Sequence, residues 1–83
     1  MKEPIYEFQI ARDTVRLFDT YLQIEQEGSR DSYYVLSKIQ NIEIKHNYTK
    51  RNIELWINGE TLLSFYDSDL EKVKKLISLI VEK

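Results

Sequence analysis

The chain has 83 residues and a formal net charge of -2, and this length predicts a single domain over residues 1–83. Charged residues make up 31% of the sequence, but the two signs nearly cancel. No global field therefore attracts polyanions, and we do not expect nucleic-acid binding. Cysteine is absent, which excludes disulfides, thiolate zinc sites and cysteine nucleophiles.

The N-terminal residues open no apolar run, and the longest aliphatic cluster, near the C-terminus, is interrupted by charged residues. A membrane-spanning helix needs about 20 consecutive, mostly apolar residues. We therefore expect a cytoplasmic protein without a signal peptide or a transmembrane segment.

Apolar and polar residues alternate along most of the chain, which is the period of a strand with one buried face. Residues 14–26 are compatible with two strands or with one strand that bends. Leu36, Ile39 and Ile42 are spaced by three, and this spacing predicts one tight turn. Polar and glycine-containing breaks then delimit seven expected strands, at about residues 5–10, 14–18, 21–26, 32–36, 41–46, 52–58 and 60–66.

The dipeptide Asn58-Gly59 predicts a hairpin, usually with a two-residue type I′ turn. The side chains favour a different loop, because a two-residue loop would pair Ile57 with Glu60 and mix the two faces. We expect a loop with an odd number of residues, such as three with Gly59 left-handed. The outer face would then carry Glu54, Trp56, Leu62, Ser64 and Tyr66.

The last segment has the period of an amphipathic helix, predicted over residues 68–82. Ser68 followed by Glu71 has the spacing of a capping box. A helix of this length is only marginally stable alone, so its apolar stripe should cover the core. Leu79 falls among the polar residues and is either a scattered surface leucine or the edge of a partner contact. Six residues form the stripe within an arc of roughly 140°: Leu70, Val73, Leu76, Ile77, Ile80 and Val81.

Two stretches carry a family resemblance. Residues 15–24, VRLFDTYLQI, resemble the strand pair near the start of small bacterial pleckstrin-homology-like (PH-like) and GRAM-like domains. Residues 32–39, SYYVLSKI, followed by NIEI at 41–44, resemble the strand, tight turn and isoleucine that precede that family's second sheet. The resemblance implies an α+β fold with about seven antiparallel strands in a bent barrel closed by one C-terminal helix.

Members of the PH-like family bind phosphoinositides, peptides or other proteins, so the resemblance implies a binding module rather than an enzyme. Its lipid-binding members usually carry a basic motif between their first two strands. Here that connection is Ala11-Arg12-Asp13-Thr14, with one arginine beside one aspartate, which argues against phosphoinositide binding at this place.

An apolar outer face of the final hairpin is the leading candidate site. Trp56, Leu62 and Tyr66, with Leu79 at one edge, would form the kind of patch that marks a protein interface. The alternative is that the helix or the N-terminal segment covers these side chains, and the sequence leaves both interpretations open.

A second candidate is the basic segment 45–51, in which Lys45, His46, Tyr48, Lys50 and Arg51 could hold a phosphate or a lipid head group. A solvated loop is the alternative interpretation. His46 is the only histidine, so neither a catalytic triad nor a multi-histidine metal site can be assembled around it.

No catalytic residues, metal ligands or cofactors are expected. Asp67, Ser68, Asp69 and Glu71 lack the ligand count and turn glycine of a calcium loop, and helix capping explains them better. The leading hypothesis is thus a non-catalytic module that binds a protein partner, or itself as a homodimer. Anion or phospholipid binding through residues 45–51 is the alternative, and a small phage or mobile-element inhibitor of a host factor would have the same features.

Overall fold

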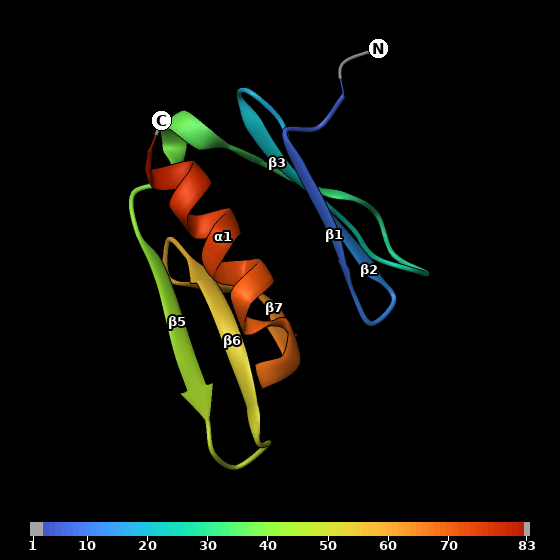
Figure 1. Cartoon of the computed structure of the whole chain (residues 1–83), viewed down its shortest axis with the longest axis vertical. Coiled ribbons are helices and arrows are strands. Elements are labelled where there is room, and N and C mark those ends of the chain that lie inside the picture. The colour runs from blue at the N-terminus through green and yellow to red at the C-terminus, as the bar shows by residue number, and fades with distance from the viewer. Residues whose placement is uncertain (1–2, 83) are drawn as a thin grey trace. The chain divides into compact units, whose positions relative to one another are not determined.

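The computed structural model describes residues 3–82, which contain seven strands in two antiparallel sheets and one C-terminal α-helix (Figure 1). The expected α+β composition is therefore confirmed. Internal contacts divide the chain into two compact units, residues 1–38 and 39–83, and each is described by itself. The single domain and the closed barrel stay predictions.

The first unit is a four-stranded sheet in the order β1-β2-β3-β4. Its strands are β1 (Tyr6–Ile10), β2 (Asp13–Leu17), β3 (Tyr21–Glu25) and β4 (Ser32–Val35). Residues 14–26 thus form two strands rather than one that bends. The 3-10 turn η1 (Leu36–Lys38) follows β4, where the spacing of three predicted a tight turn, so that prediction is confirmed.

Alternate side chains of β2 and β3 are buried, as the period of two requires: Val15, Leu17, Leu22 and Ile24 are at most 1% exposed. On the polar face, the Arg16 guanidinium lies 2.7 Å from Glu7 and 3.1 Å from Glu25. Its hydrogen bond to Glu7 is the largest cause that raises the pKa of Arg16. Charges on this face therefore satisfy one another within the sheet.

The second unit is a three-stranded sheet in the order β5-β6-β7, followed by a helical segment. Its elements are β5 (Ile42–Asn47), β6 (Asn52–Ile57), β7 (Glu60–Phe65), the 3-10 turn η2 (Asp67–Asp69) and the helix α1 (Leu70–Val81). Ile44 pairs with Leu55, and Leu55 pairs with Leu63. These pairs place the aliphatic residues of all three strands on one face, and Leu55 is only 1% exposed.

The β6–β7 hairpin corrects the expected odd loop. Ile57 pairs with Glu60, so the loop is the two-residue Asn58-Gly59, with φ of 53° and 81°, as a type I′ turn requires. The faces nevertheless agree beyond the turn, because a β-bulge lies opposite Leu55 and Trp56 and leaves Leu62 as the extra residue. The extra residue therefore puts the apolar side chains of β7 back on the same face as those of β6, which the two-residue turn alone would not do.

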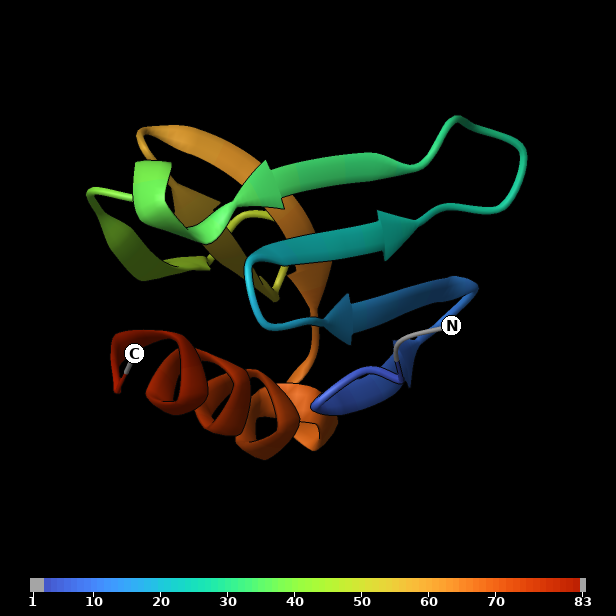
Figure 2. The same ribbon diagram turned by 90° about the horizontal axis from the view of Figure 1, so that it is seen from above.

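The helix begins at Leu70, and Asp69 is its N-cap without a side-chain capping bond. Ser68 lies inside η2, so the expected capping box is wrong. In Figures 1 and 2, α1 lies over one face of the β5-β6-β7 sheet, and Val73 and Leu76 of its stripe are fully buried. Val81, at the last helical residue, is 70% exposed. The other three stripe residues are half-buried: Leu70, Ile77 and Ile80.

Candidate binding pocket

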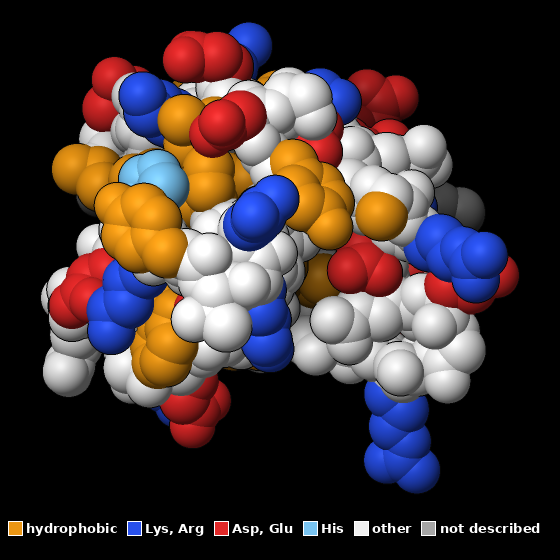
Figure 3. All heavy atoms as spheres, turned by 90° about the horizontal axis from the view of Figure 1, so that it is seen from below, with side chains coloured by type: hydrophobic (Ala, Val, Ile, Leu, Met, Phe, Trp, Pro, Cys, Tyr) orange, Lys and Arg blue, Asp and Glu red, His pale blue; other side chains and the backbone are white. Residues whose placement is uncertain are grey.

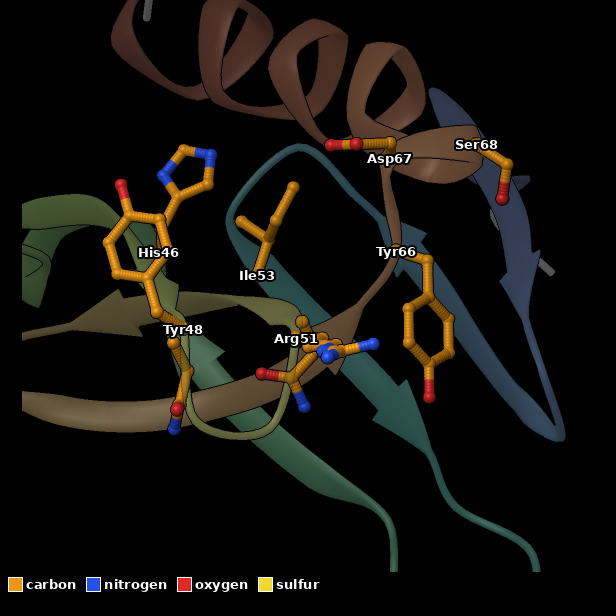
Figure 4. Close-up of a pocket in the computed structure, with 9 residues that line it drawn as sticks. His46, Tyr48, Arg51, Ile53, Tyr66, Asp67 and Ser68 are labelled. Atoms are coloured by element: carbon orange, nitrogen blue, oxygen red, sulfur yellow. The ribbon is translucent and has the colours of Figure 1, made fainter.

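A pocket of about 500 Å³ opens at one end of the β5-β6-β7 sheet (Figure 4). At this end β5 turns into β6, and β7 runs into the turn η2. The pocket is lined by His46, Asn47, Tyr48, Arg51, Asn52, Ile53, Tyr66, Asp67 and Ser68. Its volume lies within the range of about 300–1,000 Å³ that is usual for ligand pockets.

One wall of the pocket is the β5–β6 loop. Asn47 pairs with Asn52, so four residues connect the two strands. The Asn47 side chain fixes this loop, since its Oδ1 accepts a hydrogen bond of 3.1 Å from the Lys50 backbone N–H. The rings of His46 and Tyr48 stack with their centroids 6.1 Å apart and their planes at 18°. The wall is therefore aromatic.

The opposite wall is the segment that leaves β7. Tyr66 is 64% exposed, and its carbonyl accepts a hydrogen bond of 2.9 Å from the Asp69 N–H, which holds the turn η2. Asp67 and Ser68 of that turn also line the pocket. Ile53 lies between the two walls in Figure 4 and is only 3% exposed, so it forms an apolar floor.

The surface around the pocket mixes apolar and charged side chains. In Figure 3 the pale-blue histidine borders orange hydrophobic side chains, with blue and red side chains around them. Since His46 is the only histidine of the chain, this marks the pocket's aromatic wall. Among the residues that line the pocket, Arg51 is the one arginine or lysine and Asp67 is the one aspartate or glutamate.

The structure divides the basic segment that the sequence singled out. His46, Tyr48 and Arg51 line the pocket. Lys45 and Lys50 are not among its lining residues. Lys45 points elsewhere, with its Nζ 4.1 Å from the centroid of the Trp56 ring and 3.4 Å from a Glu43 carboxylate oxygen. The five residues proposed for an anion site therefore do not converge on one point.

The outer face of the sheet is occupied by a polar network around Trp56. This indole is half-buried, and its Nε1–H donates a hydrogen bond of 3.2 Å to Glu54. Lys45 lies over the ring. A hydrogen bond from Asn41, followed by the hydrogen bond and the charge of Lys45, lowers the pKa of Glu43. Trp56 thus has partners within its own sheet for both its ring and its N–H.

The four residues proposed for a partner site do not form one patch. Leu62, expected on the outer face, is buried at 8% exposure, because the bulge places two successive leucines inward. Leu79 is half-buried on α1. Trp56 pairs with Thr61, near the hairpin turn, while Tyr66 follows the other end of β7. Tyr66 lies one residue beyond the Ile53–Phe65 pair, so it is four residue positions along β6 from Trp56, which is about 13 Å.

Asp67 and Ser68 belong to the pocket although the sequence suggested only a capping role for them. Asn47, Asn52 and Ile53 were not identified as site residues at all. The signal that could have placed them is the strand register, since a four-residue loop pairs His46 with Ile53. That register also brings the loop and the residues after β7 to the same end of the sheet.

Comparisons of the chain with protein-family models, curated proteins and solved structures find no match. Within residues 3–82, no helix has the length and apolar character that crossing a membrane requires. The same residues bring together no group of three or more histidine, aspartate or glutamate side chains that could hold a metal ion. The site must therefore be interpreted from its own geometry.

Proposed function

We propose that this protein is a non-catalytic interaction module of the PH-like type, with its strands in a bent barrel, and that it binds a protein partner through the pocket at the end of the β5-β6-β7 sheet. The number of strands, their antiparallel order and the C-terminal helix support the family assignment. The barrel is part of this proposal.

The observation that carries the binding proposal is the composition of the pocket. Tyr48 and Tyr66 are 85% and 64% exposed, on opposite walls, with Arg51 and His46 beside them and apolar Ile53 below. Tyrosine and arginine are, together with tryptophan, the residues that most often dominate the binding energy of protein interfaces. An open pocket that has both, with an apolar floor, fits a side chain of a partner.

The pocket is a better candidate than the outer face around Trp56. A partner that contacted Trp56 would first have to displace Lys45 from its ring, and it would gain little because the indole N–H already has an acceptor. Tyr66, by contrast, presents most of its side chain to solvent. The leading hypothesis from the sequence is thus kept, with its contact surface moved to Tyr66.

Selection from a random peptide library on the immobilised protein tests this proposal. We expect enriched peptides that lose at least tenfold in affinity for the Tyr66→Ala variant, as truncation of a central interface tyrosine does. Tyr33→Ala is the matched control, since Tyr33 is an exposed tyrosine of similar exposure, 60%, on β4. Enriched peptides that bind both variants equally well, or a library that yields no enrichment, would contradict the proposal.

Binding to a second copy of the chain is the other form of the same hypothesis. Sedimentation equilibrium of the wild-type protein up to millimolar concentration distinguishes the two forms. A dimer that Tyr66→Ala dissociates would identify the partner as the protein itself. A monomer at all concentrations would restrict the proposal to a different protein.

A further inference from the structure

We propose that the partner segment enters the pocket with an acidic side chain at Arg51 and a neighbouring apolar side chain between the tyrosines. This inference rests on the proposed function and names the chemistry of the partner. The ligand is thus a peptide segment in which aspartate or glutamate adjoins an aromatic or aliphatic residue.

Arg51 is the cation of the pocket, and it forms no ion pair with a carboxylate among the described residues. Arg12, Arg16 and Lys45 each lie within 4 Å of a glutamate carboxylate. For Arg51 the structure gives no ion pair within residues 3–82, although Asp67 lines the same pocket. The guanidinium can therefore accept a carboxylate from outside without losing an internal partner, and the planar guanidinium is well suited to paired hydrogen bonds with a carboxylate.

The apolar part of the pocket lies beside this cation. In Figure 4 the Arg51 side chain is drawn between Ile53 and Tyr66. Ile53 gives the floor, the stacked His46 and Tyr48 rings give one wall, and Tyr66 gives the other. A partner residue next to the acidic one can thus bury an aromatic or aliphatic side chain between rings, which is favourable through both apolar area and ring contacts.

Asp67 decides between a carboxylate peptide and a phosphate-rich head group. It lines the pocket with a single arginine, while the two lysines of the segment do not join them. A group with several negative charges would be repelled by Asp67 and matched by only one fixed cation. A peptide carries one negative charge in its acidic side chain, and its backbone N–H groups can donate hydrogen bonds to the Asp67 carboxylate.

Titration of the ¹⁵N-labelled protein with two capped dipeptides, followed by amide chemical shifts, tests the inference. The probes are acetyl-Glu-Phe-amide and acetyl-Gln-Phe-amide, which differ by one charge. We expect the acidic dipeptide to shift the amides of residues 46–53 and 66–68 and to bind about two- to fivefold more tightly than the neutral one, the upper part of the range for an exposed ion pair.

Variants at position 51 give the control for the cation. Arg51 has a φ of 57°, a conformation in which alanine would be strained and glycine would not. Arg51→Gly therefore removes the side chain without backbone strain and should abolish the preference for the acidic dipeptide, while Arg51→Lys should keep part of it. Arg30→Gly removes an exposed arginine of another loop and should change neither affinity.

Each alternative result overturns a defined part of the inference. Equal affinity for the two dipeptides would overturn the carboxylate assignment and leave the pocket as a site for neutral peptides. Inorganic phosphate that shifts the same amides at lower concentration than the acidic dipeptide would identify an anion site instead of a peptide site. If neither dipeptide shifts these amides, the inference is wrong, and the proposed function is then judged by the peptide selection alone.

Discussion

The two ends of strand β6 differ in how completely the fold satisfies their side chains. At the Ile57 end, Trp56 has a cation over its ring and an acceptor for its N–H, and the Asn58 side chain accepts a hydrogen bond from the backbone of Gln40, just before β5. At the Asn52 end, two tyrosines and an arginine surround an open pocket. Interactions that are complete within the fold contribute to stability, whereas incomplete ones remain available for a ligand.

This comparison predicts a separation of effects between the two ends. Substitutions at the closed end should lower the free energy of unfolding and leave binding unchanged. Substitutions at the open end should weaken binding and change the free energy of unfolding by no more than about 0.5 kcal/mol, as is usual for exposed sites. Substitutions at Asn58, Lys45 and Glu43 test the separation.

The largest loss of stability is expected for Asn58→Ala. The Asn58 Oδ1 accepts hydrogen bonds of 2.8 and 3.1 Å from the N–H groups of Gln40 and Asn41, and its φ is 53°. Alanine removes both bonds and is strained at this φ, so we expect a loss of about 2 kcal/mol in urea denaturation. Affinity for pocket ligands should stay the same.

Asn58→Gly separates the two causes. Glycine adopts positive φ without strain but cannot accept the two hydrogen bonds, so we expect about half of the loss seen with alanine. If both variants had the same urea midpoint as the wild type, Asn58 would not be a determinant of stability. If either lost affinity for peptides, the two ends of the sheet would be coupled.

A smaller effect is expected for Lys45→Ala. The Lys45 ammonium lies 4.1 Å from the Trp56 ring centroid, an arrangement worth about 0.5–1 kcal/mol at exposed sites. Removing it should lower the free energy of unfolding by that amount and shift the tryptophan emission to longer wavelength, because the indole meets more water. Lys50→Ala, which alters the loop without touching Trp56, should leave the emission unchanged.

The result for Lys45 also bears on the alternative function. If Lys45→Ala weakened binding of phosphate or of an acidic peptide as strongly as Arg51→Gly does, the basic segment would act as one anion site. The separation of Lys45 from the pocket would then have no functional meaning.

The smallest effect is the pH dependence that Glu43 contributes. The hydrogen bond from Asn41 Nδ2, 2.9 Å long, and the charge of Lys45 lower the pKa of Glu43. A lowered pKa means that its contribution to stability is present above the ordinary glutamate pKa and is lost as the pH falls through the folded value. The Glu43→Gln variant should therefore lose less stability than the wild type over that acidic range.

Carboxyl ¹³C shifts measure this titration directly. We expect the midpoint for Glu43 to lie below that of an ordinary glutamate and to rise in the Asn41→Ala variant, since the bond from Asn41 is the largest cause of the shift. A midpoint that stayed in place in Asn41→Ala would show that Lys45 alone sets it.

Much of the fold could be predicted from alternation and helix period, because both report burial directly. Ile53, Leu55 and Ile57 alternate with the residues expected on the outer face, and they are at most 3% exposed. The turn η1 and the buried helix residues Val73 and Leu76 were indicated in the same way. These features depend only on local spacing, which a single sequence contains.

The β6–β7 hairpin could not be predicted in this way, because two local signals conflicted there. Asn58-Gly59 favoured a two-residue turn, whereas the face pattern favoured an odd loop. An extra residue in β7 reconciles the two-residue turn with the face pattern. The local sign of this extra residue was the pair of successive leucines, Leu62 and Leu63. Alternation assumes a regular strand and has no place for such a residue.

The candidate site was predicted residue by residue but not as a group. Tyr66 was assigned with Trp56 because both were expected on the outer face of the final hairpin, and Arg51 was assigned with Lys45 because both belong to one basic segment. The register instead brings Tyr66 and Arg51 to one pocket and puts Lys45 over Trp56. Which side chains meet across a sheet depends on the pairing of strands, and that follows from the loop lengths.

The extra residue in β7 also affects how distant relatives should be sought. Leu62 has no cross-strand partner, and the pairs on both sides of it, Thr61 with Trp56 and Leu63 with Leu55, would keep their register if a shorter sequence lacked it. Homologous hairpins can therefore differ in length by one at this point while sharing every other pair. An alignment that forbids a gap at this position would pair every later residue, including those of α1, with the wrong residue of the homologue, and the homology would then be missed.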